Sequence, residues 1–125
     1  IYFLYVRRFT SVVAKNVAVI IQEDPRITHR PVEALRIALG LVAGSHRTTV
    51  ILLGEAVRLL TNDIDDIVDL DILEKYLPSI EQLDIPFILP KTFDISALSG
   101  KFSIRCESDD VVAAVIQSMD NTLVF

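Results

Sequence analysis

Residues 17–54 read VAVIIQEDPRITHRPVEALRIALGLVAGSHRTTVILLG, and this stretch decides the fold. It begins with a short continuous run of mostly β-branched residues, which is typical of a strand buried on both faces of a parallel sheet. From Pro31 to Gly44, apolar residues recur every three or four positions, and this spacing predicts a helix. A second apolar run at 47–53 completes a strand–helix–strand unit, so we expect two parallel strands.

The rest of the chain continues this alternation. Gly54 ends the second strand, and EAVRLL predicts a short helix at 55–60. Pro78 interrupts a later helical pattern, which predicts two short helices, one on either side of it. Further strands are predicted at 85–89, 101–105 and 121–125, with a helix after Asp110. The pattern predicts a three-layer α/β/α sandwich with a mostly parallel five-stranded sheet.

Composition narrows the classes of function. The 125 residues suffice for one domain, which we place at 16–125 after an N-terminal segment at 1–15. The net charge of −5 repels phosphate backbones, so we expect no nucleic acid partner. The apolar run at 1–6 is too short to cross a bilayer, which needs about 20 residues. We therefore expect no membrane partner.

The cysteine count indicates the cellular compartment, and the apolar content indicates whether the chain forms oligomers. A single cysteine cannot form an intramolecular disulfide, which favours the reducing cytoplasm. The apolar fraction of 51% is high for a soluble domain, so we expect a homo-oligomer with residues 1–6 as a candidate interface element. The chain lacks both the dinucleotide and the phosphate-binding glycine motifs, and we expect no cofactor.

Ligands of parallel α/β sheets bind beyond the carboxyl ends of the strands. The residues that the sequence places at this edge are predicted to border one pocket: Asp24, Arg26, His29, Gly54, Lys91 and Cys106. His29 has the chemistry of an acid, a base or a ligand, but it also fits an ordinary surface position at a helix start. No second His or Cys lies near it in the sequence, so we expect no metal site.

Cys106 has two interpretations. It is either a small buried residue that closes the fourth strand or a reactive thiol at the amino end of the next helix. The partial positive charge of a helix amino end favours a thiolate, whereas Glu107, Asp109 and Asp110 oppose it. Because these effects nearly cancel, we expect Cys106 to react slowly.

The chain resembles the DsrE/DsrF-like sulfur-relay family over about residues 16–125. The resemblance rests on the Asp24-Pro25 loop, the A-L-R-x-A-x-G pattern that follows it, the VILLG strand end and the tail SDDVVAAVIQSMDNTLVF. It implies a small α/β subunit of a trimer or hexamer with a sulfur-relay protein as a possible partner. In sulfur-accepting members a cysteine follows the third strand, but here residues 85–94 read IPFILPKTFD. Cys106 belongs to the next strand end instead.

Three functions therefore stay open at this stage. The first is a DsrE-like oligomeric subunit that lacks the usual sulfur-accepting cysteine and binds a partner or a small ligand. The second is an intracellular persulfide carrier that uses Cys106. The third is an enzyme of unknown chemistry that uses His29.

Overall fold

The structure, a computed structural model, describes residues 14–125. Its strands are β1 (Asn16–Ile21), β2 (Arg47–Leu52), β3 (Pro86–Pro90), β4 (Ser103–Glu107) and β5 (Asn121–Val124). Its α-helices are α2 (Arg30–Ala43), α3 (Leu70–Gln82) and α4 (Asp109–Ser118), and its 3₁₀ helices are η1 (Gly54–Leu60) and η2 (Ile95–Ala97). None of these helices is long and apolar enough to cross a membrane. The segment at residues 1–6, predicted to be an interface element, lies outside the described residues.

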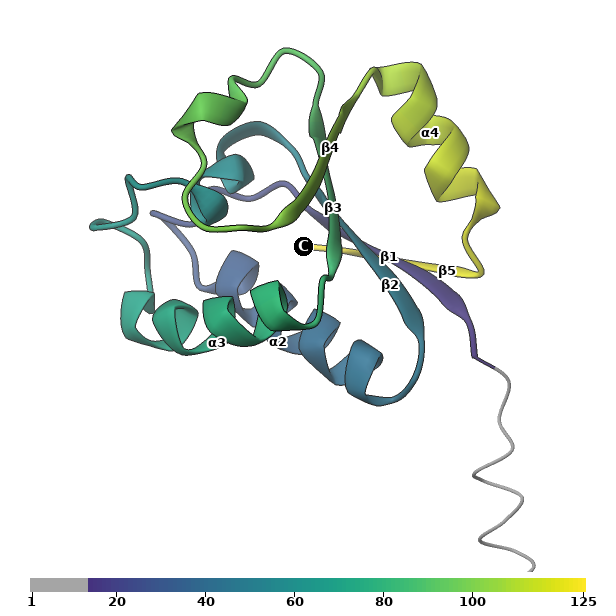
Figure 1. Cartoon of the computed structure of the whole chain (residues 1–125), viewed down its shortest axis with the longest axis horizontal. Coiled ribbons are helices and arrows are strands. Elements are labelled where there is room, and N and C mark those ends of the chain that lie inside the picture. The colour runs from purple at the N-terminus through teal and green to yellow at the C-terminus, as the bar shows by residue number, and fades with distance from the viewer. Residues whose placement is uncertain (1–13) are drawn as a thin grey trace, which may run out of the picture.

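The strands form one sheet in the order β4-β3-β2-β1-β5, and every neighbouring pair is parallel (Figure 1). The predicted three-layer α/β/α sandwich with a five-stranded parallel sheet is therefore confirmed. The bounds of β2, β3 and β5 agree with the prediction to within one residue, but β4 begins and ends two residues later than expected. Cys106 consequently lies inside β4 and not after it.

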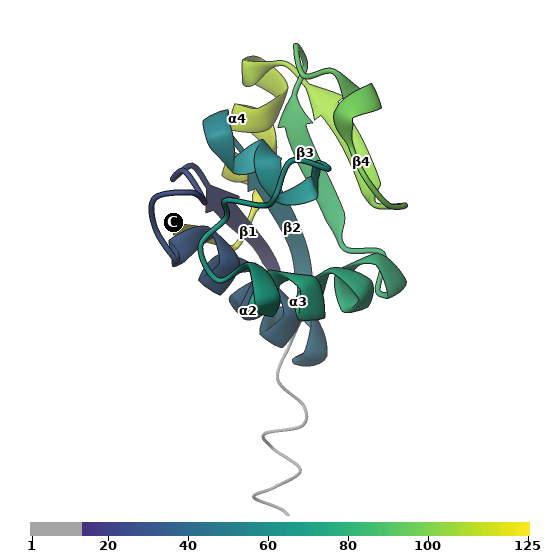
Figure 2. The same cartoon turned by 90° about the vertical axis from the view of Figure 1, so that its left-hand side faces the viewer.

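The two faces of the sheet are covered unequally. The sheet has a hydrophobic core on each face: the larger core includes Ile21, Leu35 and Leu73, and the smaller core includes Ile20 and Val112. Successive side chains of a strand point to opposite faces, so Ile20 and Ile21 of β1 lie in different cores. Helices α2 and α3 lie over the larger core, into which Leu35 and Leu73 are buried (Figures 1 and 2). On the opposite face, α4 packs Val112 against the sheet.

The order of the strands explains why α2 and α3 cover one face of the sheet and α4 covers the other. From β1 to β4 the chain adds strands in one direction, and then it returns to place β5 on the other side of β1. Connections between parallel strands are almost always right-handed, so a connection that reverses direction must cross the opposite face. Helix α4 makes this return. The reversal places the topological switch point of the sheet between β1 and β5.

Helix α3 continues through Pro78, and the predicted break into two helices is wrong. The prediction followed the local cost of an internal proline, about 3 kcal/mol. However, Leu73 and Ile80 lie on either side of Pro78 and are both buried. Burial of each such side chain contributes roughly 1.5 to 3 kcal/mol, which is enough to keep both halves of the helix on the same core.

We expect Pro78→Ala to stabilise the protein by about 1 to 2 kcal/mol, because alanine restores an N–H that can donate to the Glu74 carbonyl. Urea unfolding followed by circular dichroism measures this change. Leu73→Ala is the control and should lower the free energy of unfolding by about 2 to 5 kcal/mol. An unchanged or lower stability of Pro78→Ala would show that the proline is not a source of strain in α3.

Candidate functional site

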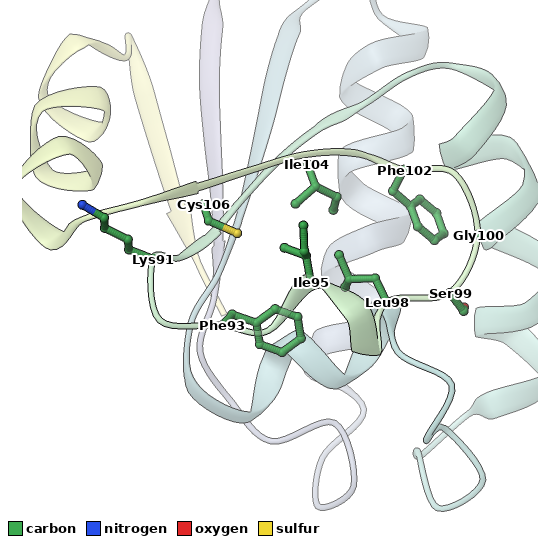
Figure 3. Close-up of a pocket in the computed structure, with 9 residues that line it drawn as sticks. All are labelled: Lys91, Phe93, Ile95, Leu98, Ser99, Gly100, Phe102, Ile104 and Cys106. Atoms are coloured by element: carbon green, nitrogen blue, oxygen red, sulfur yellow. The ribbon is translucent and has the colours of Figure 1, made fainter.

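A cavity of about 560 Å³ lies between β4 and the connection that precedes it (Figure 3). Both walls are mainly apolar. One wall comes from β4 and the residue before it, and the other comes from the connection around η2. The lining residues are Lys91, Phe93, Ile95, Leu98, Ser99, Gly100, Phe102, Ile104 and Cys106.

The connection at 91–102 is fixed near its two ends. At the start, the backbone N–H of Lys91 donates to the Glu107 carbonyl at 3.0 Å and continues the β3–β4 ladder. Near the end, the backbone N–H of Ser99 donates to the Leu60 carbonyl at 2.8 Å. Between these points the connection arches away from the strands, and the cavity lies under this arch (Figure 3).

Gly100 makes the turn from this connection into β4 possible. Its φ of 75° is in the left-handed region, and a Cβ atom there would lie 2.7 Å from an oxygen of Glu81. The same Glu81 oxygen accepts a hydrogen bond from the backbone N–H of Lys101 at 2.8 Å. A side chain at position 100 would therefore displace the carboxylate that anchors the end of the arch.

The thiol of Cys106 points into the cavity (Figure 3). Cys106 pairs with Leu89 in the β3–β4 register, and both residues pack on the side of the larger core. The residue is half-buried and forms no disulfide. It stands in β4, and two residues, Glu107 and the N-cap Ser108, separate it from α4.

Lys91 is the one charged residue among those lining the cavity. Its side chain is exposed, and its ammonium points away from the cavity (Figure 3). The interior of the site is therefore apolar apart from the thiol and the Ser99 hydroxyl. Such a surface favours apolar ligands over ions, because an ion would lose hydration without gaining a partner.

Asp24 and Arg26 form an ion pair at the carboxyl end of β1. The Arg26 side chain donates to both Asp24 oxygens, at 3.0 and 2.8 Å, and the Arg26 backbone N–H also donates to Asp24 at 2.9 Å. These hydrogen bonds to Arg26 lower the pKa of Asp24 to about 2. Arg26 also lies 3.6 Å from Glu55, which pairs with Arg58 at 2.6 Å. The network ties the loops after β1 and β2 together.

Gly54 and His29 lie near this network but not in the cavity beside β4. Gly54 has a φ of 56° and begins η1, so it serves the turn after β2. His29 is exposed directly before α2, and its side chain makes no capping hydrogen bond. Of the six predicted site residues, Lys91 and Cys106 line the cavity beside β4, whereas the other four lie in or next to the loops after β1 and β2.

The switch point between β1 and β5 is filled by side chains of the protein itself. The Arg30 guanidinium lies 5.5 Å from the centre of the Phe125 ring and 2.8 Å from Glu23. It also donates to the Val124 carbonyl at 3.3 Å. This packing explains why the candidate site lies beside β4, at the far edge of the sheet.

Sequence reasoning missed most of the cavity lining. Phe93, Ile95 and Leu98 occur in the loop between the predicted strands at 85–89 and 101–105, and Phe102 and Ile104 occur in the second of these strands. Large apolar side chains in a loop at the ligand-binding edge are unusual, and they were the available indication of a binding surface. No three His, Cys, Asp or Glu side chains within residues 14–125 are placed to hold a metal ion.

Comparison with known proteins supports the fold. No protein-family model matches the sequence, and no curated protein matches it. The structure is similar to the crystal structure of the YchN protein from E. coli, with a TM-score of 0.71 and 19% sequence identity. The match covers 89% of this chain and 99% of YchN. The chain therefore shares the fold of YchN, and membership of the DsrE/DsrF-like family stays a prediction.

The low pKa of Asp24 predicts a specific dependence of stability on pH. The pKa of Asp24 is about 2 in the folded protein, whereas its ordinary value is 3.8. As the pH falls, Asp24 is therefore protonated in the unfolded chain before it is protonated in the folded protein. The stabilisation is complete above pH about 4 and is lost as the pH falls through about 2. Asp24→Asn should therefore reduce the slope of stability against pH in this range, measured by urea unfolding. The exposed Asp65→Asn is the control, and equal slopes for both variants would contradict the assignment.

Proposed function

We propose that this chain is a DsrE/DsrF-like oligomeric subunit that binds a small apolar ligand in the cavity beside β4. The observation that carries the proposal is the cavity itself. Its volume of about 560 Å³ falls within the range of small-molecule sites, roughly 300 to 1,000 Å³. Its walls offer apolar surface, whose burial on binding is worth about 25 cal/mol per Å².

The residues after β3 favour binding over sulfur transfer. By the resemblance, a sulfur-accepting cysteine would follow this strand, but Pro90 ends β3 and Lys91 follows it. Proline and lysine cannot carry a persulfide. The position from which such members transfer sulfur is thus unable to do so in this chain.

The distribution of exposed apolar side chains supports assembly into a trimer or hexamer. Four of them lie at the carboxyl edge of the sheet: Ile27 (80% exposed), Ile95 (62%), Val111 (39%) and Val124 (51%). Apolar side chains gathered at one edge favour contact with another protein surface. A single free cysteine and the absence of any disulfide within residues 14–125 agree with a cytoplasmic protein.

Persulfide transfer by Cys106 is the second candidate function, because its thiol points into the cavity (Figure 3). In that reaction the Cys106 thiolate attacks the outer sulfur of a donor persulfide. A new S–S bond forms to Cys106, the S–S bond of the donor breaks, and the donor leaves as a thiolate without net oxidation. No basic side chain of the cavity lining points at the thiol, since the Lys91 ammonium is directed away from the cavity, which makes this function less well supported.

An enzyme that uses His29 is the third candidate, and the geometry favours it least. His29 lines neither the cavity beside β4 nor the one beside η1, and its side chain is exposed. A general base needs a partner that orients it and a site that holds the substrate within hydrogen-bonding reach.

Ligand binding can be tested with the uncharged apolar dye phenylnaphthylamine. Ile95 is exposed and lines the cavity, so Ile95→Trp should fill the cavity mouth without disturbing the buried core. We expect a loss of dye affinity of about tenfold, which equals about 1.4 kcal/mol. Fluorescence titration measures it. Ile27→Trp is the matched control, because Ile27 is also exposed but lies on the loop after β1.

Equal dye affinities of Ile95→Trp and the unchanged protein would mean that the dye does not enter this cavity. An equal loss in both tryptophan variants would mean that the dye binds exposed apolar surface in general. Either result contradicts the proposed function.

Cys106 can be tested separately by incubation with polysulfide followed by intact-mass measurement. We expect little gain of a single sulfur atom at neutral pH, because the half-buried thiol has no basic side chain of the cavity directed at it. Cys106→Ser is the control. A stoichiometric gain that disappears in Cys106→Ser would make persulfide transfer the leading function.

A further inference from the structure

Strand β5 is an edge strand whose outer side pairs with no other strand within residues 14–125. All four of its residues are exposed, although two of them, Leu123 and Val124, are large and apolar. Exposed apolar residues on an unpaired edge are a template for pairing with another strand.

The backbone of β5 shows which groups face outward. The Phe125 N–H donates to the Ile20 carbonyl, and the Phe125 carbonyl accepts from Gln22, both at 2.8 Å. Phe125 therefore directs both its groups towards β1. Since strand residues alternate, Thr122 and Val124 direct their N–H and carbonyl groups towards the free edge.

The two edges of the sheet differ in their protection against pairing. The opposite edge strand, β4, carries Arg105 and Glu107, and charged residues on an edge oppose pairing with another chain. Strand β5 carries no charged residue and no proline. Among the features of residues 14–125, the short length of β5, four residues, is what protects this edge.

We propose that two copies of this chain pair through β5, antiparallel, about a two-fold axis at Leu123. The two sheets then become one continuous sheet of about ten strands. Leu123 lies opposite its counterpart as a non-hydrogen-bonded pair, and Thr122 of each copy exchanges hydrogen bonds with Val124 of the other. This register uses the outward N–H and carbonyl groups of both residues, in about four hydrogen bonds.

Two features near β5 complement this register. Leu123 pairs with Val19 and so faces the α2 side, where it borders a shallow cavity of about 250 Å³ that Leu41 also lines. The cavity gives the partner's Leu123 apolar surface to bury. The outward Val124 carbonyl already accepts one bond from Arg30, and a carbonyl has a second lone pair for the partner's Thr122.

Charge also fits the antiparallel pairing. Asp120 precedes β5 at one end, and the half-exposed Arg30 lies at the other end beside Val124 and Phe125. An antiparallel partner brings Asp120 of one copy towards Arg30 of the other. A parallel partner would instead place like ends together, so the charges favour the two-fold arrangement.

The contact is short, so we expect a weak, concentration-dependent dimer, because stable interfaces bury more than about 1,000 Å². It involves the edge of the sheet opposite to the cavity beside β4 and is independent of the proposed ligand binding. A failure of one therefore leaves the other standing.

Disulfide trapping tests both the contact and its register. In a Cys106→Ser background, Leu123→Cys places two thiols across the two-fold axis with Cα atoms about 4.5 Å apart, within the range for a disulfide. Mild oxidation at tens of micromolar protein should give a covalent dimer on non-reducing gels. Thr122→Cys is the matched control, since its thiols are offset by two residues from each other and should cross-link at least tenfold less.

Thr122→Pro provides a second measurement. It removes an outward N–H without touching the bonds that β5 makes to β1, so it should abolish cross-linking of Leu123→Cys. The proposal is overturned if Leu123→Cys does not cross-link. It is also overturned if Thr122→Cys cross-links equally well or if Thr122→Pro leaves the cross-linking of Leu123→Cys unchanged.

Discussion

The handedness of the connection from β4 to β5 is the constraint on which the rest of the structure depends. Because the chain reverses direction after β4, α4 must cross the face that the earlier helices leave free. This crossing closes the second layer, sets β5 beside β1 and leaves β4 at the far edge. The buried, continuous strands of the centre follow from it, since both faces of β1, β2 and β3 are covered.

The same constraint decides where a cavity can form at the carboxyl edge of the sheet. In many α/β proteins the switch point is an open crevice, but here Arg30, Glu23 and Phe125 occupy it. The cavity beside β4 lies under the arch of the β3–β4 connection, where Phe93 and Phe102 contribute apolar surface. The ion pair of Asp24 and Arg26 holds the neighbouring loops, which makes it part of the support and not of the binding surface.

The sequence was sufficient for the fold because its strands are continuous apolar runs and its first helix has clear boundaries at Pro31 and Gly44. It was insufficient where a local conformational preference competed with the burial of apolar side chains. Pro78 predicted a helix break, but the buried residues on both sides of it keep α3 whole. Cys106 was placed at a strand end because apolar alternation marks β4 only weakly. The cavity went unrecognised because its lining depends on how a loop folds back over a strand, which no spacing in the sequence records.

The arch over β4 shapes the cavity but contributes little to the folding free energy of the sheet. Its middle, residues 92–97, is largely exposed, and the sheet beneath it is held by strand pairing and by the larger core. Substitutions in this segment can therefore alter the shape of the cavity at little cost in folding free energy. The shape of the cavity is therefore free to diverge during evolution while the sheet stays constant, and the same segment is the natural place to redesign the cavity.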